Sequence, residues 1–171
     1  MNAGIILSDD TEKDCQIAFL GDKLETFSVR TNDEIVELVM EREPEVVAVD
    51  AGGEEAREEL TDNEEELKEE GYIFTPHSHQ DEKRKRLDAL KNQLFKEMGA
   101  EQPEFIRFDP QISAEELAIQ GDSGLESLGV DTADIGSAGE FDAVLGAVTA
   151  RFYTQNNVRD MGIIIPEGFT E

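Results

Sequence analysis

The feature that most constrains the fold is a change in hydrophobic periodicity after residue 30. Before it, residues 3–8, 16–20 and 24–30 have the pattern of short strands, and Gly21-Asp22 forms a hairpin turn between the second and third. Three short strands in succession predict an antiparallel meander. After residue 30, helical and strand patterns alternate, which indicates a mixed α/β fold with helices on both faces of a mixed sheet.

The later elements are predicted from capping boxes, apolar stripes and stopping residues. The clearest helix carries one apolar stripe, made of Leu87, Leu90, Leu94, Phe95 and Met98. The predicted elements are a helix between Thr31 and Pro44, a buried strand at 46–49, a solvated helical stretch at 54–70, a helix at 81–98, a strand at 104–109, short helices beginning at Ser113 and Ser123, a helix beginning at Ser137 and a strand at 162–165. At this length, residues 1–171 are expected to form a single domain.

The charge is strongly one-sided, with 41 acidic residues against 15 basic ones and a formal net charge of -26. Acids spread along most of the chain, together with the absence of Trp, favour a protein from a salt-accumulating halophile. At 1 M salt the Debye length is about 3 Å, so surface repulsion is largely screened. Nucleic acid is therefore expected as a partner only at high salt. The alternative is an acidic face, at 54–70, that binds a basic partner.

Other function classes are excluded more directly. No apolar run approaches the length of a membrane span, so no membrane partner is expected. The single cysteine, Cys15, excludes an internal disulfide and a multi-cysteine metal site. With no recognisable signal peptide at the N-terminus, we expect a reducing, cytoplasmic setting. The oligomeric state is left open, although an exposed edge strand at 104–109 could pair between two copies in a homodimer.

Three short motifs carry a family resemblance: VVAVDA at 46–51, Thr61-Asp62 before an acidic helical stretch, and FDAVLGAVTA at 141–150. With the order of elements and the closing GIIIP, they make the chain similar to a widespread uncharacterised family of predicted nucleases. The resemblance implies a ribonuclease H-like fold and phosphodiester hydrolysis with two divalent ions, Mg²⁺ or Mn²⁺. It also implies that acidic ligands from the first strand, the fourth strand and the last helix meet at the carboxyl ends of the strands.

Two acids match those positions. Asp50 ends the predicted fourth strand, and Asp142 lies near the start of the last helix. Both are predicted as catalytic residues and metal ligands, with Glu140 and Asp9 as further candidate ligands. The structural alternatives are that Asp50 caps a turn, that Asp142 stabilises a helix dipole, and that Glu140 completes a capping box.

The first-strand position departs from the family pattern, because Ile6 stands where an aspartate is expected. The nearest acids, Asp9 and Asp10, lie three or four residues further on, about 10–14 Å along an extended strand. The loss of a bridging ligand predicts a degenerate active site. The competing functions are thus a metal-dependent nuclease, a non-catalytic ribonuclease H-like binding or scaffold domain, and an acidic protein-interaction module.

Two weaker candidates remain. His77 and His79 could bind a transition metal with Asp81, although a simple loop explains them as well. The only basic cluster, Lys83–Arg86, either contacts phosphate or forms the exposed start of a helix.

Overall fold

The computed structural model describes residues 1–8, 14–50, 66, 69, 81–119, 121–133, 135–160 and 163–167. Five strands form one sheet: β1 (Asn2–Ile6), β2 (Cys15–Leu20), β3 (Leu24–Val29), β4 (Val46–Val49) and β5 (Glu104–Arg107). Their order is β3-β2-β1-β4-β5. The first three strands pair antiparallel, whereas β1, β4 and β5 run parallel. The predicted meander and mixed sheet are confirmed.

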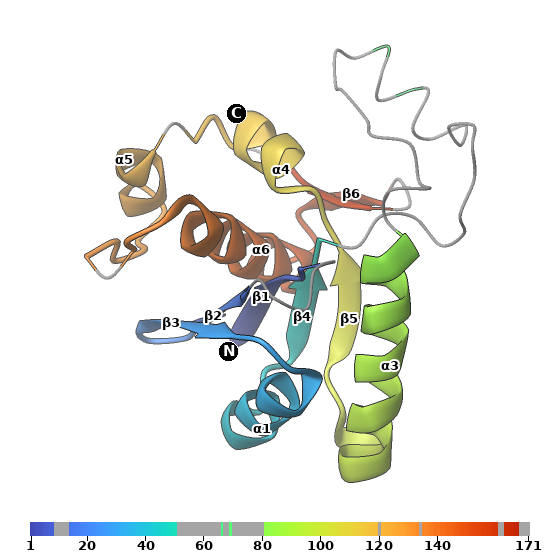
Figure 1. Ribbon diagram of the computed structural model, residues 1–171. Helices are drawn as coiled ribbons and strands as arrows, with labels where there is room; N and C mark the ends of the chain where they lie inside the picture. The colour runs from blue at the N-terminus through green and yellow to red at the C-terminus, as the bar shows by residue number, and fades with distance from the viewer. Residues whose placement is uncertain are drawn as a thin grey trace.

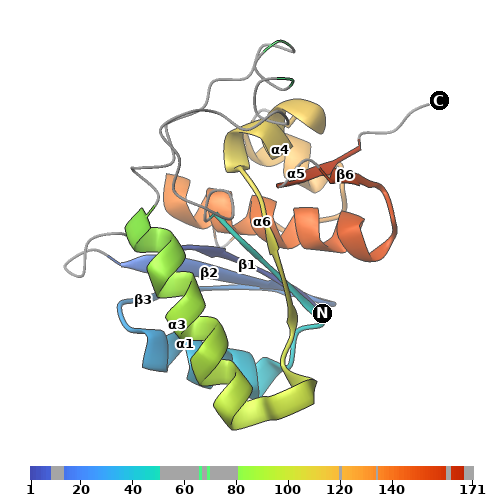
Figure 2. The same cartoon turned by 90° about the vertical axis from the view of Figure 1, so that its right-hand side faces the viewer.

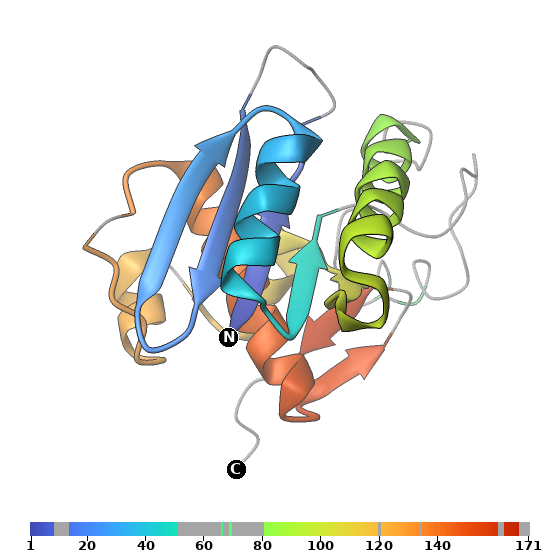
Figure 3. The ribbon, with the colours of Figure 1, turned by 90° about the horizontal axis from the view of Figure 1, so that it is seen from below.

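Helices cover both faces of this sheet (Figures 1 and 2). One face carries the long helix α6 (Ala138–Thr154), with α4 (Pro110–Glu116) and α5 (Asp122–Glu126) beyond it. The other face carries α1 (Asn32–Arg42) and α3 (Asp81–Met98), which lie in front of the strands in Figure 3. A 3₁₀ turn, η2 (Gly99–Glu101), follows α3.

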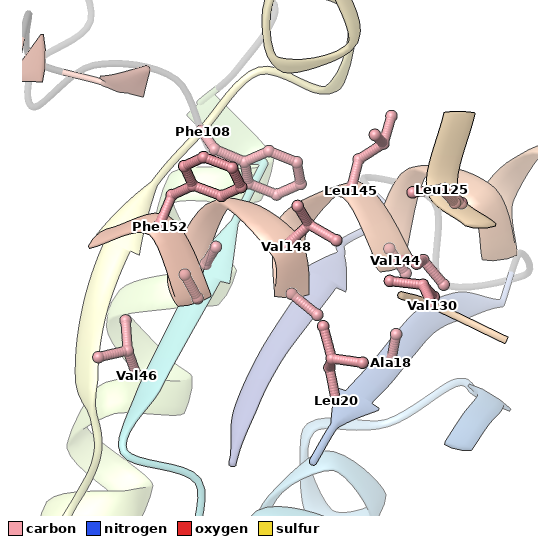
Figure 4. Packing of buried hydrophobic residues seen from close by; sticks show 14 of the residues in the cluster. Ala18, Leu20, Val46, Phe108, Leu125, Val130, Val144, Leu145, Val148 and Phe152 are labelled. Atoms are coloured by element: carbon pink, nitrogen blue, oxygen red, sulfur yellow. The ribbon is translucent and has the colours of Figure 1, made fainter. Parts of the chain in front are cut away.

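The sheet separates two apolar cores, and β4 contributes to both. Val46 and Ala48 point into the α6-side core, whereas Val47 and Val49 point into the core beneath α1 and α3. All four residues are buried, which explains why this strand is apolar without alternation. On the α6 side, Phe108 and Phe152 lie together above the strands (Figure 4).

The α6 helix approaches β1 at backbone distance. A Cβ atom added to Gly4 would lie 2.1 Å from the Ala143 carbonyl oxygen and 2.4 Å from the Ala147 nitrogen. A Cβ on Gly146 would lie 2.9 Å from the Gly4 Cα. Glycine at positions 4 and 146 is therefore required for this packing, which places the second and third turns of α6 directly over β1.

Some local predictions were wrong. Ser113 and Ser123 do not start helices, because α4 is capped by Asp109 and α5 begins after Gly121. Phe95 was placed on the apolar stripe of α3, yet it is exposed. The closing strand β7 (Ile164–Pro166) pairs with β6 (Val158–Asp160), an unpredicted strand, in a separate two-stranded sheet.

Other predictions concern residues outside the described part of the chain, namely the acidic stretch at 54–70, apart from two isolated positions, and the histidines at 77 and 79. Among the described helices, none has the length and apolar character needed to cross a membrane.

Arg86 of α3 links three segments that are distant in sequence. Its guanidinium donates to the Ser8 carbonyl at 2.9 Å, to the Asn32 side-chain oxygen at 2.9 Å and to the Arg30 carbonyl. The Asn32 amide in turn donates to the Arg86 carbonyl at 3.4 Å. This network attaches the start of α3 to the end of β1 and to the β3–α1 turn.

We expect Arg86→Met to lower the free energy of unfolding by about 2 kcal/mol or more, because it leaves half-buried acceptors without a charged donor. Urea unfolding at fixed salt measures the change, and Lys85→Met, at an exposed position one residue earlier, is the matched control. Equal urea midpoints for the two variants would contradict this prediction, because they would show that water replaces the hydrogen bonds of Arg86.

Candidate functional site: a carboxylate edge beside Lys83

Asp50 follows β4 and is held at three points. Its backbone N–H donates to the Ile5 carbonyl at 3.2 Å, and its Oδ1 accepts from the Leu7 N–H at 2.8 Å. Its Oδ2 accepts from the Lys83 ammonium at 2.6 Å. The Asp50 side chain is only 8% exposed. A buried strand end thus carries a carboxylate whose two oxygens are both already engaged.

Asp109 lies at the end of the neighbouring parallel strand. The Phe108 N–H still donates to the Val49 carbonyl at 3.0 Å, so the pairing between β4 and β5 continues up to this point. The Asp109 carboxylate then caps α4 by accepting from the N–H groups of Gln111 and Ile112 at 2.9 and 3.3 Å. Because α4 begins with Pro110, the strand ends and the carboxylate turns toward the helix.

Asp142 reaches the same edge from the α6 layer. It is the fifth residue of α6 and half-buried, one position before Ala143, whose carbonyl lies against Gly4. Burial raises its pKa, and the charges of Asp50 and Asp109 raise it further. Glu140 is the acidic residue of the first turn of α6 and Asp142 follows directly on that turn, so stabilisation of the helix dipole by Asp142 remains a prediction.

We call the side chains of Asp50, Asp109 and Asp142 the carboxylate edge. Burial raises the pKa of each of them. The Lys83 ammonium acts in the opposite direction on all three, most strongly on Asp50. At neutral pH we treat Asp50 as ionised, because a 2.6 Å contact with an ammonium favours the charged carboxylate. Figure 1 shows the arrowheads of β4 and β5 and the first turn of α3 at one end of the sheet.

Ile6 occupies the position where the family pattern places an aspartate. It is half-buried and packs against the α6-side core. The hydrogen bonds from Asp50 to Ile5 and from Leu7 to Asp50 lie on either side of it along β1. An apolar side chain therefore stands beside Asp50, on the face that α6 covers.

The other predicted ligands lie apart from this arrangement. Glu140 accepts from the Gly136 N–H at 3.1 Å and from the Thr26 hydroxyl at 3.5 Å, while its own N–H bonds to Ser137. These contacts are those of a residue that completes the α6 cap. Asp9 lies outside the described residues. A metal-ligating role for either residue remains a prediction.

The arrangement does not fit a two-metal centre as it stands. Within the residues that the structure describes, no three Asp, Glu, His or Cys side chains lie close enough to hold a metal ion. Two catalytic ions about 3.5–4 Å apart would need bridging oxygen ligands. Here Ile6 supplies none, and an ammonium is bound to Asp50.

No protein-family model and no curated protein matches this chain. Solved structures do match it. RuvC of T. thermophilus, in complex with a Holliday junction substrate, aligns over 97% of this chain and 99% of its own, with a TM-score of 0.58 and 15% identity. Another Thermus thermophilus RuvC structure aligns over 96% and 98%, with a TM-score of 0.53 and 17% identity.

The fold is ribonuclease H-like. The predicted fold class is thereby confirmed, and the two neighbours extend over nearly the whole chain. At these identities the likeness concerns the fold, and the roles of individual side chains follow from the geometry described above.

Sequence reasoning missed two residues of this site: Asp109 of the carboxylate edge, and Lys83, whose ammonium contacts that edge. Asp109 was assigned only to the end of a strand, although its position before Pro110, at the carboxyl end of a parallel strand, was a usable signal. Lys83 was grouped with a basic cluster read as phosphate-binding or exposed. The structure instead places its ammonium on Asp50 and the Arg86 guanidinium on backbone carbonyls.

Proposed function

We propose that this protein is a ribonuclease H-like domain of the nuclease class that has lost two-metal hydrolysis and acts as a binding domain. The observation that carries the proposal is the side-chain environment of Asp50. Its partner is the Lys83 ammonium, and its neighbour on β1 is the apolar Ile6. A two-metal mechanism needs free carboxylate oxygens at this position.

Nucleic acid is the proposed partner. The support is the fold shared with RuvC, which binds a Holliday junction substrate. The net charge of -26 opposes binding to phosphates at low salt, so we place the interaction at high salt, in the cytoplasm of a halophile. The acidic segment at 54–70 as a site for a basic partner remains an alternative prediction outside the described residues.

Metal-dependent phosphodiester hydrolysis is the second candidate, and Asp109 favours it. Asp50 and Asp109 both lie at strand ends, and their charges both raise the pKa of a third carboxyl, that of Asp142 on α6. In such a centre, Asp50, Asp109 and Asp142 would hold a divalent ion, which would activate water and stabilise the leaving oxygen.

Cleavage assays separate the two candidates. Single-stranded, double-stranded and branched DNA and RNA are incubated with the protein in molar KCl with Mg²⁺ or Mn²⁺. We expect no cleavage above a blank, because the described carboxylates do not form a metal-binding group. Metal-dependent cleavage that disappears in Asp50→Asn and Asp142→Asn, yet survives in the exposed-residue control Asp88→Asn, would establish hydrolysis instead.

Binding is measured on the same nucleic acids by fluorescence anisotropy over a series of salt concentrations. We expect complexes to appear as salt screens the acidic surface, the reverse of the usual decline with salt. An absence of binding at every salt concentration would overturn the partner assignment and leave the loss of hydrolysis standing.

A further inference from the structure

We infer that the Lys83 ammonium is the resident cation of the carboxylate edge and that it excludes divalent metal from Asp50. This inference rests on the proposed loss of the two-metal centre and names the residue that maintains the loss. It concerns Asp50, Asp109, Asp142 and Lys83, which come from four different elements or their ends.

Both carboxylate oxygens of Asp50 already accept a hydrogen bond. The Leu7 N–H is bonded to Oδ1 at 2.8 Å and the Lys83 ammonium to Oδ2 at 2.6 Å. The side chain is 8% exposed and that of Lys83 is 22% exposed, so this ion pair is largely withdrawn from water. A divalent ion at Oδ2 would lie beside the ammonium, whose positive charge in this partly dehydrated site repels a second cation.

The position of Lys83 within α3 also indicates a specific role. It is the third residue of the helix, where the positive end of the helix dipole disfavours a cation. Arg86 fixes the first turns of α3, and buried Leu87 and Leu90 anchor the same part of the helix. The ammonium is thus held at an unfavourable helix end by its contact with Asp50.

Removal of the ammonium would leave Asp50 with one side-chain hydrogen bond, from the Leu7 N–H to Oδ1, and with no counter-charge for its buried carboxylate. A hard divalent cation prefers carboxylate oxygens and would supply that counter-charge. Loss of the lysine charge should therefore allow a divalent cation to bind at Oδ2 of Asp50.

The test compares metal binding by the full chain and its variants in molar KCl, using MnCl₂ as the probe. Lys83→Met removes the charge, and Lys83→Gln removes it while keeping a hydrogen-bond donor. Lys83→Arg keeps the charge, and Lys85→Met is a control for loss of a lysine on the same helix. Melting temperature with and without Mn²⁺ is the first measurement, and Mn²⁺ electron paramagnetic resonance titration is the second.

We expect Mn²⁺ to raise the melting temperature of Lys83→Met and Lys83→Gln by roughly 5 °C or more at about 100 times the dissociation constant. Wild type, Lys83→Arg and Lys85→Met should show no such rise. If Lys83→Met is unfolded without metal, recovery of its helical circular dichroism on adding Mn²⁺ counts as the same result.

Two results would overturn the inference. Either wild type binds Mn²⁺ as tightly as Lys83→Met, or neither neutral variant gains Mn²⁺ binding. The cleavage assay decides the proposed function separately, because it measures hydrolysis by wild type, whereas this experiment measures metal binding by variants.

Discussion

Gly4→Val is expected to lower the free energy of unfolding by about 3 kcal/mol or more, and it could prevent folding altogether. A Cβ at residue 4 would lie 2.1 Å from the Ala143 carbonyl and 2.4 Å from the Ala147 nitrogen. Both contacts are with backbone, so no side chain can rotate away. Relief requires α6 to lift off β1, which opens the core on that face.

Thermal and urea unfolding at fixed molar salt measure this effect. Gly21→Ala is the control, because a Cβ there meets only the flexible Met1 side chain at 3.4 Å or beyond. We expect that variant to stay within about 0.5 kcal/mol of wild type. Comparable stability of Gly4→Val and Gly21→Ala would mean that α6 packs further from the sheet than described.

Asp50→Ala is expected to lower the free energy of unfolding by about 3–5 kcal/mol, because it leaves a largely buried ammonium without its partner. It also leaves the Leu7 N–H without its acceptor. Asp50→Asn should be milder, since the amide oxygen can still accept from Leu7. The double variant Asp50→Ala/Lys83→Met should recover much of the loss, which a double-mutant cycle measures as coupling.

The exposed Asp14–Arg30 ion pair is a control that shows how much of the Asp50→Ala effect depends on burial of the Asp50–Lys83 pair. It has a similar distance, 2.8 Å, but its side chains are 43% and 65% exposed. Solvent screening makes such pairs weak, so Asp14→Ala should change stability far less. If Asp50→Ala and Asp14→Ala had equal effects, the Asp50–Lys83 pair would have to be screened by water as well.

Sequence periodicity predicted most of the architecture because each element follows local rules. Thr31 and Ser137 cap α1 and α6 as their capping boxes indicate, and the apolar run at 46–49 is a doubly buried strand. The capping rules gave the wrong start for α4, where the sequence offers two possible N-terminal caps, Asp109 and Ser113. Asp109 with Pro110 starts α4 four residues before the Ser113 box, because a proline at the first helical position favours that start.

The site was less predictable because it depends on distant contacts. Asp50 was found from its place after a strand, and Asp142 from the family pattern; Asp142 is the fifth residue of α6. Nothing in local sequence links Lys83 to Asp50, 33 residues away. Their pairing depends on how α3 is seated against α1 and the end of β1.

The surroundings of Ile6 determine which substitutions could build a metal site in this protein. Ile6→Asp alone would add a fourth acid beside a carboxylate that Lys83 already occupies, and it would remove an apolar contact from the α6-side core. Lys83→Met alone would leave Asp50 without its counter-charge. Each single substitution is therefore expected to be unfavourable. If the proposed function holds, a two-metal centre at this edge would need both substitutions together, so the effect of each depends on the residue at the other position.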